Sequence, residues 1–497
     1  FFTLEKNLEY EAVIGLETHV QLDTETKMFS SCSNNYQSAE PNTVVDPVTL
    51  ALPGTLPVVN KKAIEDAIAI GLSLNCSIRE ITKFDRKQYT YPDLMKGYQI
   101  SQFDQPICYN GYIDLPNNQI TRVRINRVHM EEDVAKLIHE YGVDGEPTHT
   151  LIDVNRSGVP LMEIVTEPDM NTSEEVELYI SSLQKIIRYL EVGTANMEEA
   201  SFRCDANISV RKKGEKKLTT KVEIKNMNRI KAVTRAIEFE ISRQIKEIES
   251  GGKIVQETRG WNDHKGITVS QRSKEEANDY RYFPEPDIPP LKIYNSTIEK
   301  VKSKLPELPL QKKSRFIKEY KLSDYDTELL TSSKNVAEYF EKTITNINIE
   351  NEDYKQRYAK ETANWVNGEI FRYLKENKVS DIQSFPISPQ NLSILIEKII
   401  TKKINNNSAK KIFEIMLKNN ENPEKIIDKL NLVIVKDDNK LNSIINEIIS
   451  NNPSAVEDYN NGKENALKFL MGQLMKQTKG QADPNQSIKL IRSKLDQ

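Results

Sequence analysis

Strict alternation of apolar and polar residues over residues 202–211 constrains the fold more than any other feature of this sequence. The apolar positions are Phe202, Cys204, Ala206, Ile208 and Val210, and the polar ones are Arg203, Asp205, Asn207, Ser209 and Arg211. Because successive strand side chains point to opposite faces, the pattern predicts a strand with one dry and one charged face. Such a strand belongs in an antiparallel sheet that is covered on one side only.

Three further segments fit the same sheet. Residues 15–22 and 218–225 also alternate, with Leu16, Val20, Leu22, Leu218, Val222 and Ile224 opposing Glu17, His19, Gln21, Lys221, Glu223 and Lys225. A β-branched run at 122–125 forms the fourth strand, which is capped by the acidic sequence 129–133. If these strands are neighbours, the polar residues that can converge on the charged face are Glu17, His19, Glu132, Asp205 and Glu223.

The acidic sequence His129-Met130-Glu131-Glu132-Asp133 places three carboxylates and an imidazole within five residues. Carboxylates this close repel one another unless positive charge compensates them. A divalent cation such as Mg²⁺ or Mn²⁺ is the usual source of that charge, because carboxylate oxygens are hard ligands. Taken alone, the cluster fits a solvated acidic turn better. The polar faces of the other strands are what favour a metal site.

The rest of the first half is predicted to contain helices and one polar loop. Apolar periodicity predicts helices over residues 61–74, 172–190 and 231–249, with Ser173 able to cap the second. Residues 84–93, extended by Lys96, are rich in Arg, Lys and Tyr, as a site loop is, although an ordinary surface loop fits as well. The proline-rich residues 279–290 indicate a rigid exit from the first domain.

After residue 296, helical periodicity replaces the strand pattern. We therefore predict an α+β fold with three domains: a cradle around an antiparallel sheet at 1–296, a helical domain at 297–412 and a small helical tail at 413–497. Trp365 is expected in the helical core. Residues 463–497 carry seven Lys and Arg against three Asp and Glu. This local basic stripe, with Lys463, Lys468, Lys476 and Lys479, is a candidate phosphate-binding surface, and a solvated helical face is the alternative.

Composition and missing motifs narrow the chemistry. The net charge is −4, so no global positive field attracts a polyanion. The sequence has no run of eighteen apolar residues, no evident signal peptide and no Cys-x-x-Cys pair, and its four cysteines are expected to be thiols in a reducing compartment. Phosphate-binding glycine loops and nucleophile elbows are also absent. The catalytic groups that remain possible are carboxylates with a hard metal. This combination favours metal-assisted phosphoryl transfer.

Several of these motifs together resemble the B subunits of aspartyl/glutamyl-tRNA amidotransferases. The resemblance spans nearly the whole chain. It rests on VIGLETHV at 13–20, FDRK at 84–87, YQISQFDQP at 98–106, HMEED at 129–133, FRCDAN at 202–207, residues 279–290 and KQTKGQADP at 476–484. A related archaeal glutamyl-specific subunit shares the first domain but carries a large extra domain, for which this chain has no obvious room.

The resemblance implies an ATP-dependent and Mg²⁺-dependent ligase. In the family, the side-chain carboxylate of Glu or Asp misacylated on tRNA(Gln) or tRNA(Asn) is phosphorylated and then amidated with ammonia from an amidase subunit. A small third subunit completes a heterotrimer. The resemblance assigns Mg²⁺ binding and catalysis to Glu17, His19, Glu132, Asp205 and Glu223, the ammonia passage to Lys87, Tyr89 and Lys96, ATP contacts to Arg203 and Lys225, and tRNA contacts to Lys468, Lys476 and Lys479.

Two other classes of protein compete with this interpretation. A noncatalytic tRNA-binding scaffold accounts for the basic tail but not for the acidic residues. A self-contained carboxylate–amine ligase accounts for the metal, but the chain has no glutaminase nucleophile motif. We expect a cytoplasmic protein without a membrane partner, with a plastid or mitochondrion as the alternative.

Overall fold

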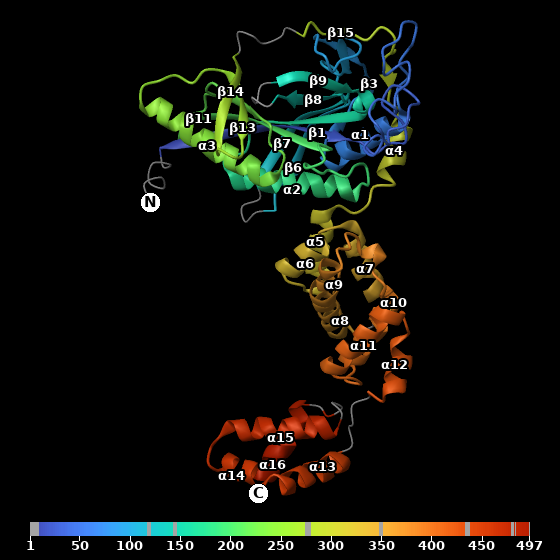
Figure 1. The fold of residues 1–497 in the computed structure, drawn as a ribbon, viewed down its shortest axis with the longest axis vertical. Coiled ribbons are helices and arrows are strands. Elements are labelled where there is room, and N and C mark those ends of the chain that lie inside the picture. The colour runs from blue at the N-terminus through green and yellow to red at the C-terminus, as the bar shows by residue number, and fades with distance from the viewer. Residues whose placement is uncertain are drawn as a thin grey trace. The chain divides into compact units, whose positions relative to one another are not determined.

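The computed structural model describes residues 9–116, 121–142, 147–273, 280–346, 351–432, 438–478, 482 and 484–496. It divides into two compact units, Phe1–Leu308 and Pro309–Gln497. Figure 1 shows the strands in the first unit, while the described part of the second is helical. The predicted α+β class, with a sheet-rich first part followed by helices, is confirmed.

Nine strands of the described residues form the central sheet of the first unit, in the order β14-β13-β12-β11-β1-β10-β7-β6-β2. Their bounds are β1 Tyr10–Gln21, β2 Ser77–Ile78, β6 Cys108–Asp114, β7 Arg122–Glu132, β10 Pro160–Thr166, β11 Phe202–Lys212, β12 Val222–Lys225, β13 Glu257–Asn262 and β14 Ile267–Ser273. Neighbours run antiparallel except β12 and β13, which are parallel. The alternating segment 202–211 is β11, and its apolar side chains are buried.

Two strands differ in length from the sequence prediction. β12 begins only at Val222, and Leu218 is exposed. β7 continues from Arg122 through Glu132 and pairs with β10, so the acidic sequence is largely strand rather than a cap. Because strand side chains alternate, Glu131 and Glu132 project from opposite faces. Only one of these two adjacent carboxylates can therefore lie on the charged face.

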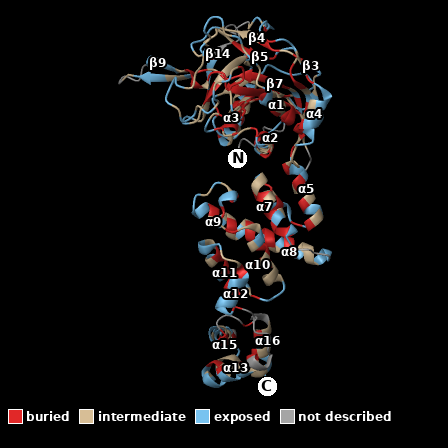
Figure 2. Cartoon of the chain, turned by 90° about the vertical axis from the view of Figure 1, so that its right-hand side faces the viewer, coloured by how far each residue is buried: buried red, intermediate tan, exposed pale blue. Residues whose placement is uncertain are grey.

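Helices cover the apolar face of the sheet. They are α1 (Lys61–Ser73), α2 (Ser173–Tyr189) and α3 (Ile230–Glu249), and they share one core with the strands. Figure 1 shows α2 and α3 on one side of the sheet, and Figure 2 shows buried residues concentrated along β7 and α1. The three helix predictions are confirmed, with one correction. Thr172 rather than Ser173 is the N-cap of α2, because its side chain accepts from the Glu175 N–H in a capping box.

Smaller sheets flank the central one. β15 (Phe283–Pro284), β4 (Asp85–Gln88) and β5 (Tyr98–Ser101) form the first; β16 (Leu291–Lys292) pairs with β3 (Ile81–Thr82), and β8 (Lys136–Tyr141) pairs with β9 (Pro147–Asp153). The prolines of residues 280–290 therefore do not form an extended exit. This part of the chain returns to the first unit, where the proline-restricted β15 pairs with only one strand, β4.

The boundary between the units lies after the predicted one. α4 (Asn295–Lys302) buries Val301 in the core of the first unit, and the unit ends at Leu308 rather than at residue 296. The second unit begins with α5 (Pro309–Tyr320). Its next elements are α6 (Asp324–Leu330), α7 (Lys334–Thr345), α8 (Glu352–Trp365), α9 (Phe371–Glu376), α10 (Pro389–Ile400), α11 (Asn406–Asn419) and α12 (Pro423–Leu430).

Trp365 lies in the core of these helices, as predicted, with its ring centroid 5.2 Å from that of Phe413. Phe413 lies inside α11, so a domain boundary between residues 412 and 413 would cut a packed helix. A separate apolar cluster is formed by α13 (Asp438–Asn451), α14 (Pro453–Asn460), α15 (Glu464–Gln477) and α16 (Pro484–Leu495). No described helix is both long and apolar enough to span a bilayer.

Candidate functional site

A row of charged side chains crosses four strands on the face of the sheet opposite α2 and α3. The strand registers place Arg203 beside His19, His19 beside Glu163 and Glu163 beside His129. Directly paired residues on neighbouring strands point to the same face, with Cβ atoms about 4.5–5.5 Å apart. The strand pairing itself therefore assembles two imidazoles and a carboxylate from distant parts of the sequence.

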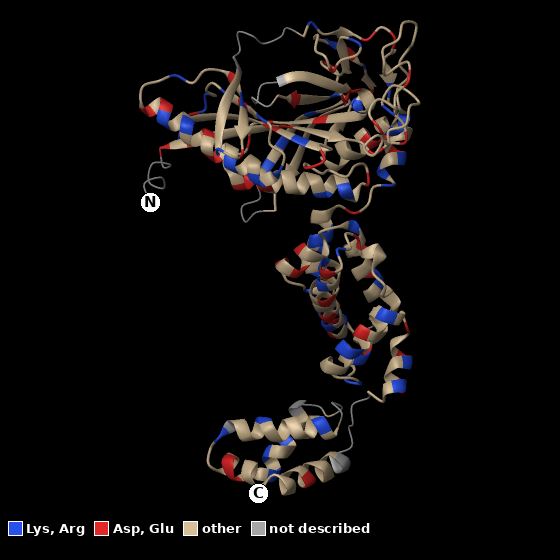
Figure 3. Cartoon of the chain, viewed as in Figure 1, with Lys and Arg blue, Asp and Glu red and all other residues tan. Residues whose placement is uncertain are grey.

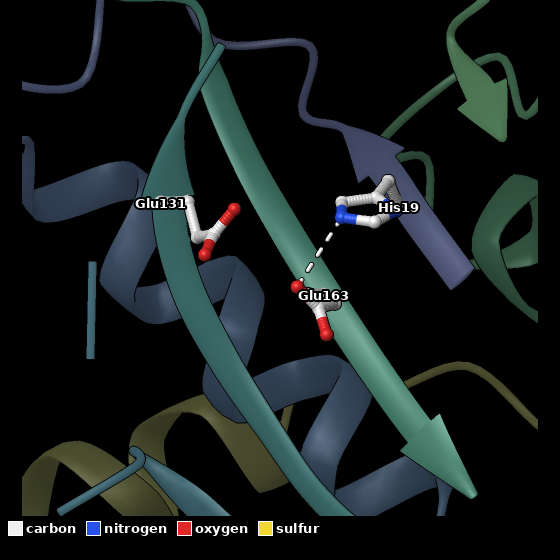
Figure 4. Close-up of side chains that lie close together, drawn as sticks. All are labelled: His19, Glu131 and Glu163. Atoms are coloured by element: carbon white, nitrogen blue, oxygen red, sulfur yellow. Dashed lines mark ion pairs between the residues drawn. The ribbon is translucent and has the colours of Figure 1, made fainter. Parts of the chain in front are cut away.

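His19, Glu131 and Glu163 form the centre of this row. His19 Nε2 lies 3.2 Å from Glu163 Oε2, and one ligand atom from each of the three residues lies within 4.8 Å of the others. Figure 4 shows Glu131 and Glu163 on neighbouring strands, with the dashed line joining His19 to Glu163. One nitrogen and two carboxylate oxygens at this spacing are a ligand set that suits a divalent cation.

Neighbouring side chains hold Glu131 in place. Ser101 Oγ donates to Glu131 Oε1 at 2.7 Å, and Gln99 Nε2 donates to Glu131 Oε2 at 3.2 Å. His129 Nε2 lies 3.2 Å from Glu131 Oε1 and 3.5 Å from Glu163 Oε2, so it bridges both carboxylates. The small sheet that contains β5 therefore orients Glu131 from outside the ligand set.

The electrostatics of the row keep its two central carboxylates ionised. Burial disfavours charge on Glu163, but His129 and the hydrogen bond to His19 outweigh it and lower the pKa of Glu163 to about 2. Burial also opposes charge on Glu131, yet Lys87 and His129 hold the pKa of that carboxyl well below its usual value. For Glu17, burial and repulsion by Glu163 raise the pKa. Burial is the larger cause, and Glu163 and Glu223 add repulsion to it.

A second group of polar residues continues the row over β1, β11 and β12. Asn207 Nδ2 donates to Glu17 Oε1 at 2.9 Å. Lys225 Nζ donates to Asp205 Oδ2 at 3.0 Å and lies 3.2 Å from Glu223 Oε1. Three of the sequence-predicted residues, Glu17, Asp205 and Glu223, therefore do share one face of neighbouring strands. In this structure a lysine lies between the two outer carboxylates.

Glu132 lies apart from the carboxylates around His19. Its carboxylate pairs with Lys96 Nζ, and Oε1 also accepts from the backbone N–H of Ile100 at 3.1 Å. The structure thus pairs Glu132, which was predicted to bind the metal, with Lys96, which was predicted to line the ammonia passage. The physical reason is the alternation of β7, which turns Glu132 away from the face that Glu131 occupies.

Arg203 is anchored beside the row by Asp133. Its guanidinium nitrogen lies 3.2 Å from Asp133 Oδ1, and Gln21 Nε2 donates to Asp133 Oδ2 at 2.7 Å. The Asp133 charge raises the pKa of Arg203, so the cation is permanent. Arg203 Nε has no partner among the described residues although it is buried. The Arg203 side chain is 37% exposed, so part of its guanidinium is accessible to an anion.

Lys87 and Tyr89 lie on β4 and just after it, facing the same carboxylates. Lys87 Nζ is 5.1 Å from the ring centroid of Tyr280 and 6.0 Å from that of Tyr89. Although burial works against the charge, Glu131 raises the pKa of Lys87. Aromatic faces attract cations, so these two rings help to stabilise positive charge close to Glu131.

The predicted tRNA-binding lysines are only partly described. Lys468 and Lys476 lie exposed on α15. Lys479 lies outside the described residues. Lys463 is exposed just before α15 and pairs with Asp458 at 2.8 Å.

Sequence reasoning missed Glu163 and chose Glu132 where the structure brings Glu131 to His19. A signal for Glu163 was available, because it is a single charged residue in the apolar run of β10. A charge in such a run points to a polar partner on the same face. For Glu131, the register of β7 decides which of the two adjacent glutamates faces His19. Amino-acid composition does not reveal that register.

Comparisons with known proteins agree over nearly the whole chain. Residues 12–299 match the model of the GatB/GatE catalytic domain, and residues 338–495 match that of the GatB domain. The B subunit of an aspartyl/glutamyl-tRNA(Asn/Gln) amidotransferase from Dehalococcoides mccartyi is 51% identical over 98% of this chain and 99% of its own length. The same-named proteins of Caldicellulosiruptor bescii and Carboxydothermus hydrogenoformans are 48% and 47% identical, over 98% of this chain and 100% and 99% of theirs.

The similarity to these relatives covers 98% of the chain, and the two family models match residues in both units. The chain therefore belongs to the family of aspartyl/glutamyl-tRNA amidotransferase B subunits, whose first part is the GatB/GatE catalytic domain.

Proposed function

We propose that this chain is the subunit of a glutamine-dependent tRNA amidotransferase that converts Glu-tRNA(Gln), Asp-tRNA(Asn) or both to the amidated forms. The observation that carries the proposal is similarity over 98% of the chain to proteins of that name. The reaction activates a side-chain carboxylate with ATP and amidates it with ammonia. An amidase subunit and a small third subunit are the proposed partners, the cytoplasm is the proposed location, and the four cysteines are free thiols.

His19, Glu131 and Glu163 would hold Mg²⁺, with Glu17 beside them. The ligand types and their spacing fit the ion. When bound, Mg²⁺ screens the phosphate charge from the attacking carboxylate. Glu132, Asp205 and Glu223 remain proposed members of the wider site, in which they pair with Lys96 and Lys225.

The cations of the face have separate proposed tasks. Arg203, whose side chain is 37% exposed, and Lys225 would bind phosphate oxygens of ATP. Lys87, Tyr89 and Lys96 would line the path by which ammonia reaches the activated carboxylate. Because Lys87 is held charged next to Glu131, it would contribute electrostatic stabilisation rather than act as a base.

The decisive experiment reconstitutes this chain with its amidase and small subunits. The complex should convert Glu-tRNA(Gln) or Asp-tRNA(Asn) to the amide only with ATP, Mg²⁺ and glutamine or ammonia. A noncatalytic scaffold would bind tRNA but show no ATP turnover dependent on misacylated tRNA. That result would refute the proposal.

Glutamine should be inert toward this chain alone. No nucleophile elbow occurs in its sequence, and its four cysteines are not poised as thiolates, since burial raises the pKa values of all four. Ammonia release, measured by a coupled dehydrogenase assay, should stay at the no-enzyme background until the amidase subunit is added. Release of ammonia by the purified single chain would contradict the proposal that the amidase subunit hydrolyses glutamine.

Deletion of residues 438–497 should weaken tRNA use and leave the catalytic face intact. This cut spares Phe413 and α12, which pack with the helical core, and removes only the separate cluster of α13–α16. We expect KM for misacylated tRNA to rise about tenfold, with a smaller salt dependence of binding, because phosphate contacts are lost. Lys468→Gln with Lys476→Gln should reproduce part of the effect. An unchanged KM in the truncated enzyme would show that the tail does not bind RNA.

A further inference from the structure

A pocket of about 520 Å³ lies beside the catalytic face of the first unit. Its walls come from the end of β1, from residues between 22 and 37, and from residues before β10 and β11. Leu22 and Val159, both buried, are its aliphatic lining residues. The volume lies within the range of about 300–1,000 Å³ that is usual for small-ligand sites. The pocket can therefore take a group as large as a nucleoside.

The lining of this pocket is polar but carries no positive charge. Asp23 and Glu25 contribute two exposed carboxylates. No lysine or arginine of the described residues lines the pocket, although Figure 3 shows such residues interspersed with Asp and Glu along α3 of the same unit. The lining also has four amide side chains, each with both donors and an acceptor, which belong to Gln21, Asn34, Asn35 and Gln37. The pocket therefore suits a neutral group that forms hydrogen bonds, and it repels phosphate.

A chain of hydrogen bonds connects the pocket to Arg203. The Tyr36 hydroxyl, in the lining, donates to Gln21 Oε1 at 3.1 Å, and Gln21 Nε2 donates to Asp133 Oδ2 at 2.7 Å. The other oxygen of Asp133 accepts from Arg203 at 3.2 Å. Asp133 is buried, whereas Arg203 is exposed in part. The pocket and an accessible guanidinium therefore lie on two sides of one fixed carboxylate, and a ligand in the pocket can place a negative end at Arg203.

The order of groups along the face matches the order of groups in a nucleotide. Gln21 follows His19 by two residues on β1, so the two side chains share a face about 7 Å apart along the strand. Arg203 pairs with His19 from one neighbouring strand, and Glu163 pairs with it from the other. From the pocket, the face thus presents first a guanidinium and then the proposed metal ligands. ATP likewise has a nucleoside, then phosphates, of which the last is transferred.

The 3′-terminal adenosine of an aminoacylated tRNA fits this order less well. Its phosphate lies on the 5′ side of the ribose, and its aminoacyl group lies on the 2′ or 3′ side. With this adenosine in the pocket and its aminoacyl group toward Glu163, no phosphate would lie between them at Arg203. The position of the guanidinium therefore favours ATP as the source of the nucleoside.

We propose that this pocket binds the adenosine part of ATP while Arg203 holds the phosphates. Asn35 and Gln37 are exposed amides of the lining, and they contact the base, because an amide matches the N6 donor and N7 acceptor of adenine. Asp23 and Glu25 accept hydrogen bonds from the ribose hydroxyls, as carboxylates do in other nucleotide sites. The inference rests on the proposed function, and it adds the residues that select adenine.

The test measures binding to the reconstituted three-subunit complex by calorimetry, with Mg²⁺ and two probes, ADP and inorganic tripolyphosphate. Asn35→Ala with Gln37→Ala removes two exposed amides, so the double variant should fold. Its Kd for ADP should rise about tenfold, as the loss of two hydrogen bonds implies, while its Kd for tripolyphosphate stays that of the wild type. The matched control is Asn126→Ala with Gln271→Ala, two exposed amides of the same unit that do not line the pocket.

The outcomes separate this site from the proposed function. Amidation by the wild-type complex together with an unchanged Kd for ADP in the double variant would overturn the pocket proposal alone. An equal loss of tripolyphosphate affinity, or an equal loss of ADP affinity in the control pair, would also overturn it, because the change would then not concern the nucleoside. A raised KM for misacylated tRNA with unaltered ADP affinity would assign the pocket to the 3′ end of tRNA and reject ATP. Selective loss of ADP affinity would support the pocket even if the wild-type complex failed to amidate tRNA.

Discussion

Replacing Glu163 by glutamine should abolish Mg²⁺-dependent amidation, with a fall in rate of at least about 100-fold. Glu163 Oε2 is the atom that His19 and His129 share, at 3.2 and 3.5 Å, so its charge organises the whole row. Glutamine keeps the shape of the side chain and removes that charge. Because the pKa of Glu163 is about 2, the carboxylate is ionised throughout the working range, and the variant loses a full negative charge.

Metal binding gives the test a readout besides activity. Mn²⁺ titrated into the three-subunit complex and followed by electron paramagnetic resonance should bind the wild type, with binding greatly weakened in Glu163→Gln. Glu167→Gln is the matched control, since Glu167 follows the same strand but accepts from Asn126 Nδ2 at 2.7 Å and lies outside the row. If Glu163→Gln bound Mn²⁺ as the wild type does and still amidated tRNA, the site at His19, Glu131 and Glu163 would not be the metal centre.

The two-faced strands could be predicted because alternation is a local property. Each of β1, β11 and β12 shows in its own sequence which side chains are dry and which are charged, and the structure places Glu17, His19, Asp205 and Glu223 on the charged face accordingly. What alternation does not reveal is where a strand ends. β7 continues into the acidic sequence, and this continuation determines that Glu131, not Glu132, faces His19.

The sequence also did not predict that β15 pairs with β4. A proline-rich segment is compatible with an exposed linker and with a short edge strand alike, and only the partner decides between them. Here the partner is β4, nearly two hundred residues earlier, and the decisive contact is between Arg86 and Glu285. Neither residue stands out locally, because an arginine and a glutamate are ordinary in a charged chain.

That contact leads to the prediction with the largest effect on stability. Arg86 Nε and a terminal nitrogen donate to the two carboxylate oxygens of Glu285 at 2.7 and 2.8 Å, and the Glu285 side chain is fully buried. Glu285→Ala leaves the arginine without its partner, and breaking a buried ion pair in this way costs about 3–5 kcal/mol. Asp287→Ala should cost at most about 1 kcal/mol, because Asp287 is 39% exposed and lies 3.2 Å from the same guanidinium.

Unfolding of the first unit by urea can be followed separately from that of the second. The chain has two tryptophans, Trp261 in the first unit and Trp365 in the second, so a Trp365→Phe background reports on Trp261 only. In that background the midpoint should fall sharply for Glu285→Ala and little for Asp287→Ala, and Arg86→Ala should be non-additive with Glu285→Ala. Since Lys87 follows Arg86 on β4, amidation should weaken together with stability. Equal midpoints for the two acidic variants would mean that residues 283–287 act as an exit after all, and that the position of Lys87 does not depend on them.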